Sequence, residues 1–267
     1  MNLFHAFLLG IMQGLTEFIP VSSTAHLLIG QTILKLPADD ATFSFLVIVQ
    51  LGTLISLFAF YWRDLISIAR ATLDFRRSTP ERNIGFYILI ATVPALLFGY
   101  LLSDAVRALF RQPMLQASIR LFAAAVLLTL AEALTRKNRT LDTMSWFDAL
   151  IVGVFQIIAV FPGASRSGTT ISGGMFRGFD RPSAARFAFL MSVPVMLAAG
   201  GYESVQVILL PNTTEFLPIL MTGFVSSAIV GWFAIRWLLA YLREHSLYVF
   251  AIYCAVGGLL SILSWVL

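Results

Sequence analysis

The stretch FPGASRSGTT, residues 161–170, lies between two apolar runs and decides how the chain folds. A proline and two glycines interrupt the helical pattern there, and an arginine stands between two serines. A charge at the centre of a bilayer costs about 2.5–3.5 kcal/mol on insertion scales. Broken backbone is tolerated at membrane depth where it is buried in protein or lines a polar cavity. The stretch therefore predicts a helical hairpin whose tip ends inside a membrane domain.

The composition is that of a membrane protein. Of the 267 residues, 58% are hydrophobic and 12% are charged, whereas soluble domains carry about 25% charged residues. We therefore predict an all-α, polytopic membrane protein with one membrane domain over residues 1–267. The single cysteine, Cys254, excludes an intramolecular disulfide and a cysteine-built zinc site. The net charge of +4 is assigned to loop arginines that set membrane orientation, so no nucleic-acid partner is expected.

Six apolar runs have about the 20 residues that a membrane span needs. They cover about 43–62, 84–102, 116–135, 187–203, 216–240 and 246–266. Two further stretches, 3–35 and 147–177, are broken, and their second limbs (about 24–35 and 167–177) are too short to cross a bilayer. The pattern predicts six transmembrane helices and two re-entrant helical hairpins.

The two broken stretches resemble each other. GIMQGLTEFIPVSSTAH (10–26) matches GVFQIIAVFPGASRSGTT (153–170) at Gly10/Gly153 and Gln13/Gln156, and both then reach a proline and a serine-rich turn. Three predicted spans follow each copy, and an odd number of crossings turns the second copy upside down. We therefore predict an inverted repeat with halves of about 1–140 and 141–267, whose broken helices converge near the midplane.

The basic residues predict the orientation. If the hairpins do not cross, twelve lysines and arginines fall on one side and three on the other. The twelve are Arg63, Arg70, Arg76, Arg77, Arg82, Arg136, Lys137, Arg139, Arg177, Arg181, Arg186 and Arg243. Cytoplasmic loops carry the excess of positive charge. Both termini and the opening of the site are therefore predicted on the outer face.

The second tip has the chemistry of a phosphate site. The N-terminus of a helix attracts anions through its free amide groups and its dipole. The guanidinium of an arginine matches phosphate oxygens two at a time. Hydroxyls and a glycine that lets the backbone approach closely complete the set. The candidate phosphate-binding residues are Ser165, Arg166, Ser167, Gly168 and Thr170.

The first tip supplies different groups. Gln13 and Glu17 are four residues apart, so a helix presents both on one face, and their oxygens suit Mg²⁺ or Ca²⁺. After the proline come Ser22, Ser23 and Thr24, with His26 one turn further, and a serine near a histidine can be a nucleophile beside its proton acceptor. Ser22 and Thr24 are candidate substrate-binding residues.

Structural roles for the same residues stay open. Glu17 and Arg166 can form an ion pair that only holds the tips together. The serines can cap the second limb, and His26 can be a polar residue satisfied within its hairpin.

The paired motifs QGLTEFIPVSSTAH and PGASRSGTTISGG resemble the undecaprenyl-diphosphate phosphatases associated with bacitracin resistance. The likeness extends over nearly the whole chain, including FSFLVIVQLGTL and RFAFLMSVPVM. It implies a bacterial cell-membrane enzyme that removes the terminal phosphate of a C55 isoprenyl diphosphate on the outer face. It also implies that both tips form the active site. Two positions depart from the family pattern: the first acidic position is Gln13, and Cys254 stands where many members carry arginine.

We expect Ser23 to attack the phosphate while His26 exchanges protons, with a divalent cation on Glu17 and Gln13. The competing mechanism uses metal-activated water with Glu17 as the base. The alternative from another class is a lipid-phosphate transporter or flippase, because inverted repeats with broken helices are common in transporters. A dual role is also open. A homodimer is the expected oligomer.

Overall fold

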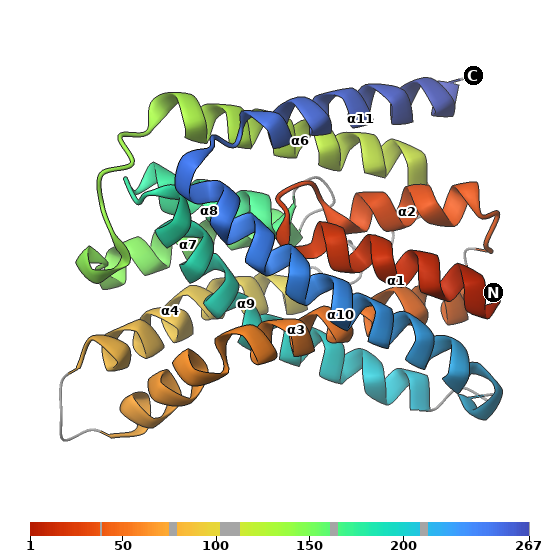
Figure 1. The fold of residues 1–267 in the computed structure, drawn as a ribbon, viewed down its shortest axis with the longest axis horizontal. Coiled ribbons are helices and arrows are strands. Elements are labelled where there is room, and N and C mark those ends of the chain that lie inside the picture. The colour runs from red at the N-terminus through yellow and green to blue at the C-terminus, as the bar shows by residue number, and fades with distance from the viewer. Residues whose placement is uncertain (38, 75–78, 102–112, 161–164, 209–212, 267) are drawn as a thin grey trace.

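The computed structural model describes residues 1–37, 39–74, 79–101, 113–160, 165–208 and 213–266 (Figure 1). Within these ranges every regular element is helical, so the predicted all-α class is confirmed. The first half contains α1 (Leu3–Phe18), α2 (Ser23–Ile33), α3 (Asp40–Leu73), α4 (Pro80–Leu101) and α6 (Pro113–Leu134). The second contains the short 3₁₀ helix η1 (Leu141–Thr143), then α7 (Trp146–Val160), α8 (Arg166–Phe176), α9 (Arg181–Ile208), α10 (Thr213–Glu244) and α11 (Tyr248–Val266).

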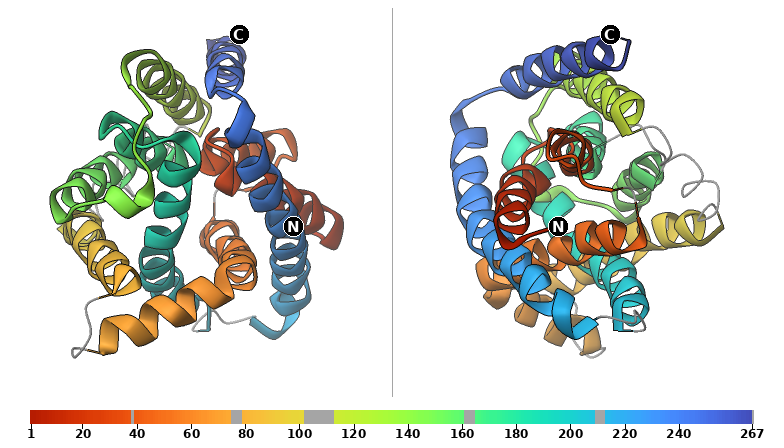
Figure 2. Two further views of the ribbon diagram at one scale, coloured as in Figure 1. Left: turned by 60° about the vertical axis from the view of Figure 1, so that its left-hand side comes forward. Right: turned by 90° about the vertical axis from the view of Figure 1, so that its right-hand side faces the viewer.

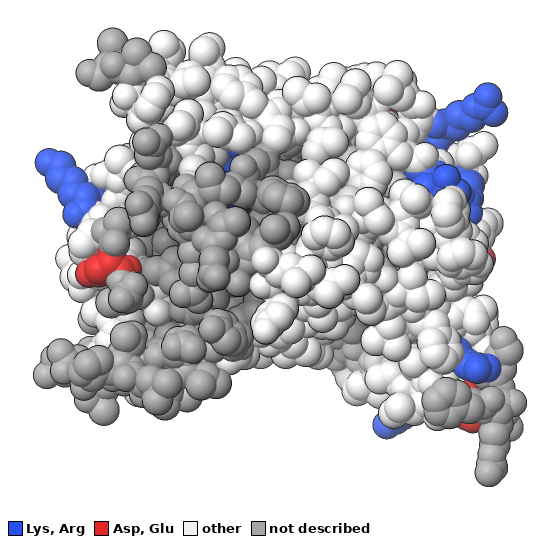
Figure 3. All heavy atoms as spheres, turned by 180° about the vertical axis from the view of Figure 1, so that it is seen from behind, with Lys and Arg blue, Asp and Glu red and all other residues white. Residues whose placement is uncertain are grey.

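In the described part of the chain, five helices are long and apolar enough to cross a membrane. They lie in α3, α4, α6, α10 and α11. The chain is thus a multi-pass membrane protein, and on the face drawn in Figure 3 most of the described charged side chains lie towards two opposite ends of the molecule. The sixth predicted span, 187–203, falls within α9, which is 28 residues long but is not among the five. The full arrangement of six spans stays a prediction.

Both predicted helix breaks are present. Proline disfavours helical backbone in the residue before it, and Ile19, before Pro20, is extended at φ −63° and ψ 131°. Ser22 then takes the left-handed conformation, with φ 68°, and α2 begins at Ser23. In the second stretch α7 ends at Val160, Ser165 is extended and α8 begins at Arg166, whereas residues 161–164, with the predicted break at Pro162, lie outside the described residues. The second limbs, α2 and α8, each have 11 residues; such a helix is about 16 Å long, about half the hydrocarbon thickness.

The helices of the two predicted halves pack crosswise. α1 lies along α10, and α7 lies along α4 (Figure 2). The matched glycines allow both contacts: a Cβ on Gly10 would lie 2.6 Å from the carbonyl oxygen of Gly223, and one on Gly153 would lie 2.6 Å from that of Ala91. Real Cβ atoms do not approach backbone so closely. Glycine at these two positions therefore lets each first limb reach its partner helix.

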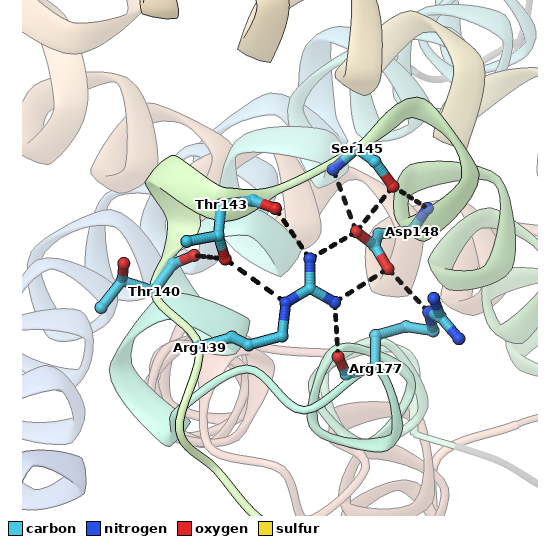
Figure 4. Close-up of polar contacts among 6 residues, drawn as sticks. All are labelled: Arg139, Thr140, Thr143, Ser145, Asp148 and Arg177. Carbon is cyan, nitrogen blue, oxygen red and sulfur yellow. Dashed lines mark hydrogen bonds and ion pairs between the residues drawn. The ribbon is translucent and has the colours of Figure 1, made fainter.

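A buried carboxylate anchors the base of the second hairpin (Figure 4). Asp148, with a side chain 1% exposed, accepts hydrogen bonds from Arg139 Nη1 (3.1 Å), Arg139 Nη2 (2.8 Å) and Arg177 Nε (2.7 Å). The hydrogen bond to Asp148 raises the pKa of Arg139, which also donates to the Arg177 carbonyl (2.8 Å). Arg139 precedes α7 and Arg177 follows α8. The cluster thus ties the two open ends of the hairpin together and fixes the direction of its tip.

Candidate active site

The tips of the two hairpins meet through one ion pair. Arg166 Nη2, in the first turn of α8, donates to Glu17 Oε1, in the last turn of α1. The two side chains are 22% and 5% exposed, respectively. These residues are 149 positions apart in the sequence, so the contact exists only because the hairpins converge. The structure therefore brings together the two charged groups that the sequence placed at the tips.

The second oxygen of Glu17 organises the first tip. Glu17 Oε2 accepts hydrogen bonds from Gln13 Nε2 (2.7 Å) and from Ser23 Oγ (2.6 Å). Gln13 lies one turn earlier on α1, and Ser23 is the first residue of α2. The carboxylate thus receives three side-chain donors. Because the Ser23 hydroxyl donates to it, Glu17 is in position to take the proton of Ser23.

The start of α8 forms the floor of the site. Ser165 caps this helix: its Oγ accepts from the Gly168 amide (3.1 Å) and lies 3.2 Å from Ser167 Oγ. Ser167 also donates to the Ile19 carbonyl in the first tip (3.3 Å). A Cβ on Gly168 would lie 3.7 Å from the Pro20 carbonyl oxygen. The helix that presents Arg166 is therefore packed directly against the turn of the other hairpin.

The remaining candidate hydroxyls have local roles in this arrangement. Thr170 is buried, and its hydroxyl donates to the Arg166 carbonyl (2.7 Å). Ser22 is the N-cap residue of α2, but its side chain makes no capping hydrogen bond. Thr24 lies partly buried in the first turn of α2. Whether these three contact substrate stays a prediction.

His26 is held by two partners, neither of which is Ser23. Its Nδ1 lies 2.8 Å from the Ser22 carbonyl, and its Nε2 lies 2.7 Å from the hydroxyl of Tyr253 on α11. A carbonyl can only accept, so Nδ1 carries the proton. In the neutral ring Nε2 then accepts from Tyr253. The two rings lie nearly parallel, with 5.6 Å between centroids.

Sequence reasoning missed Tyr253, which is 227 residues from His26. The residues around it, FAIYC, carry no signal for this contact. On the same helix, Cys254 is buried with its sulfur 3.9 Å from the Pro20 carbonyl oxygen. α11 therefore closes the site beside the first tip.

The oxygen atoms available at the first tip determine whether the predicted divalent cation fits there. Gln13 Oε1 is buried and has no hydrogen-bond partner among the described residues, so one amide oxygen is available as a ligand. Glu17 is beside it, but Arg166 and Ser23 already use its two oxygens. The described residues contain no cluster of three or more His, Cys, Asp or Glu side chains that could hold a metal. The tip fits a cation only if phosphate and water supply most of its ligands.

An ion pair joins the tips, and a separate cavity lies away from them. It has a volume of about 510 Å³ and lies at the ends of α3 and α4, where Trp62, Arg63, Arg70 and Glu81 line it. We place the chemistry at the tips because the buried charges, the hydroxyls and the helix N-terminus converge there.

Comparison with known proteins gives consistent results. Residues 6–260 match the family model described as "Bacitracin resistance protein BacA". A protein of Anaeromyxobacter dehalogenans named undecaprenyl-diphosphatase is 41% identical over 265 residues, covering 97% of this chain and 90% of its own. Proteins of that name from Chlorobium phaeovibrioides (38% identical; 98% and 97% covered) and Rubrobacter xylanophilus (40% identical; 95% and 94% covered) are similar over nearly their whole length.

Proposed function

Because the chain belongs to the bacitracin resistance protein BacA family, we propose that it hydrolyses undecaprenyl diphosphate to the monophosphate and inorganic phosphate. The relatives that carry the name undecaprenyl-diphosphatase align over nearly the whole chain. The observation that supports a single site for this reaction is the contact of Glu17 with both Arg166 and Ser23 between the two tips. The transporter alternative finds no support among these relatives.

Arg166 and the N-terminus of α8 would bind the terminal phosphate. For this the guanidinium must exchange its Glu17 partner for phosphate oxygens, which it can bind two at a time. The amide groups of the first turn and the hydroxyls of Ser165 and Ser167 point to the same helix end. Preorganised donors of this kind stabilise the charge that develops on the equatorial oxygens in phosphoryl transfer.

Ser23 is the proposed nucleophile. Its Oγ forms a bond to the terminal phosphorus while its proton passes to Glu17, and the phosphoanhydride bond to the prenyl monophosphate breaks. The prenyl monophosphate leaves as an anion. Water then hydrolyses the phosphoserine and releases inorganic phosphate. Glu17 replaces His26 here as the proton acceptor, because Ser23 donates to Glu17 in the structure.

His26 is assigned to the second step. With Nδ1 fixed on the Ser22 carbonyl, Nε2 is the nitrogen that can accept a proton from water once Tyr253 releases it. Glu17 and Gln13 would hold a divalent cation, which when bound offsets the negative charge of the diphosphate.

Radiolabelled substrate tests this mechanism. We expect rapid quenching after mixing the purified protein with undecaprenyl diphosphate labelled at the terminal phosphate to recover label on Ser23. The Ser23→Ala variant should give none. Inversion of configuration at a chirally labelled terminal phosphorus, without a labelled enzyme, would instead support the metal-activated water mechanism, because the two displacements of the phosphoserine route retain the configuration.

The orientation is a separate proposal: both termini and the opening of the site face the outside. Cys254 is fully buried, so engineered surface cysteines can be labelled selectively. A membrane-impermeant maleimide applied to intact cells should modify Asn2→Cys and leave Asp142→Cys unmodified. The reverse pattern would invert the topology. The proposed homodimer is tested by the mass of the purified complex in detergent.

A further inference from the structure

A second guanidinium is buried within a membrane-spanning helix at the depth of the tips. Arg120 belongs to α6, and its residue is 5% exposed. A charged side chain inside a span is costly and marks a substrate or ion pathway more often than a structural position. The sequence carried this signal, since Arg120 lies inside the predicted span 116–135. The mechanism above makes no use of it.

The contacts at the far end of α6 fix its depth. Glu132, near the end of α6, forms an ion pair with Arg181, which begins α9 shortly after α8 ends at Phe176. Counting back along α6, Arg120 lies about 18 Å from Glu132 at 1.5 Å per residue. Counting back along α8, Arg166 lies about 15 Å from Phe176 by the same rise. Both helices run towards the same end, so the two arginines lie at a similar level.

The packing of α6 against α11 independently places Arg120 at the same depth as the tips. Leu247 donates its amide to Glu132 Oε2 (3.1 Å), and a Cβ on Gly257 would lie 3.4 Å from Leu121 Cδ1. α6 and α11 are thus antiparallel. This register puts Cys254, which contacts the Pro20 carbonyl in the first tip, within about one helical turn of the level of Arg120. α6 also packs against α2 and α8, the helices that begin at the two tips.

Gln116 provides a second observation on the same side of α6. It precedes Arg120 by one turn, and residues four apart share a helix face. Gln116 is 5% exposed, and neither its amide nitrogen nor its amide oxygen has a hydrogen-bond partner among the described residues. Leaving both buried groups unpaired costs free energy. A polar ligand that binds beside Arg120 would remove that cost.

We propose that Arg120, supported by Gln116, binds the phosphate that stays attached to the prenyl chain. The proposal rests on the proposed function. The terminal phosphate on the N-terminus of α8 lies beyond Arg166 in the direction away from Phe176. The second phosphate is one bridging oxygen further. Side chains of a helix lean towards its N-terminus, so Arg120 extends from α6 in that direction. Arg166 thus binds the terminal phosphate, and Arg120 binds the phosphate attached to the prenyl chain.

Product inhibition separates the two arginines. The Arg120→Gln variant should raise the inhibition constant of prenyl monophosphate about 10- to 100-fold, as for the loss of one charge-assisted hydrogen bond. It should leave the inhibition constant of inorganic phosphate unchanged. Arg166→Lys should raise the constant for inorganic phosphate instead. Arg236→Gln is the matched control, because Arg236 is an exposed arginine of α10 stacked on Trp232 and should change neither constant.

An unchanged constant for prenyl monophosphate in a folded Arg120→Gln protein would overturn the proposal, and so would equal changes in both constants. Arg120→Lys keeps the charge and should give an intermediate value, which provides the test if Arg120→Gln does not fold. Hydrolysis by the wild-type protein tests the proposed function separately. If wild type releases no phosphate, binding of a methylene-bridged prenyl diphosphonate to wild type and Arg120→Gln still tests the second phosphate site.

Discussion

Replacing Arg166 by lysine keeps the positive charge at the junction of the tips but removes the planar fork. A bidentate arginine site does not tolerate lysine as an equivalent. We expect kcat/KM for undecaprenyl diphosphate to fall at least tenfold, which corresponds to about 1.4 kcal/mol of transition-state stabilisation. Stability should change little, because an ammonium still faces the Glu17 carboxylate.

The Arg166→Met variant separates structure from catalysis. It leaves the Glu17 carboxylate, whose side chain is 5% exposed, without a charged partner. Breaking a buried ion pair in this way costs about 3–5 kcal/mol. Gln13 and Ser23 still donate to Glu17, so we expect the lower end of that range. Adding Glu17→Gln removes the unpaired charge, and the double variant should recover stability but no activity.

The assay combines phosphate release in detergent, without any gradient, with thermal unfolding followed by fluorescence. Arg186 and Asp64 provide the control: they form an ion pair at 3.2 Å, but their side chains are 46% and 40% exposed. Exposed pairs contribute about 0–1 kcal/mol, so Arg186→Met should alter neither stability nor turnover appreciably. Wild-type turnover by Arg166→Lys would refute the assignment of Arg166 to the phosphate.

The other predictions concern groups around the junction and the packing behind it. Glu17→Gln should lower phosphate release and abolish its response to Mg²⁺ or Ca²⁺; an unaltered metal titration would remove Glu17 from the cation site. Tyr253→Phe removes the donor that His26 Nε2 must lose before it accepts a proton from water, so removal of one neutral hydrogen bond should raise the rate of phosphoserine hydrolysis about 2- to 10-fold and change the pH profile. An identical rate and profile would separate Tyr253 from catalysis. Gly52→Ala places a Cβ against the carbonyl of Phe224 and should destabilise the protein by about 1–3 kcal/mol. Gly99→Ala is the control, because open space surrounds Gly99 and the added Cβ should not destabilise the protein. Equal unfolding temperatures for the two variants would contradict the helix packing.

The helix breaks were predictable from the sequence because proline acts locally. Pro20 disfavours helical backbone at Ile19, and the serine-rich turn after it distinguishes Pro20 from Pro94, Pro194 and Pro218, which lie inside helices. The meeting of Glu17 and Arg166 was also predictable, because two charges in apolar hairpins have few partners other than each other. The first inference uses a local backbone restriction by proline, and the second uses the high cost of an unpaired charge in a membrane.

Partner choice within the site could not be predicted in the same way. Ser23 and His26 are three residues apart, which suggested a pair. In the structure the Ser23 hydroxyl donates a hydrogen bond to Glu17, and His26 is hydrogen-bonded to Tyr253. The choice depends on how α11 lies against α2, which is a property of packing between distant segments.

The most direct test of the junction between the tips is an experimental structure with a methylene-bridged prenyl diphosphonate. We expect its terminal phosphonate between the two hairpins, with the Arg166 guanidinium at about 2.7–2.9 Å from phosphonate oxygens and Ser23 Oγ facing the phosphorus. Density for the headgroup away from the tips, for example in the cavity beside Arg63 and Arg70, would contradict it.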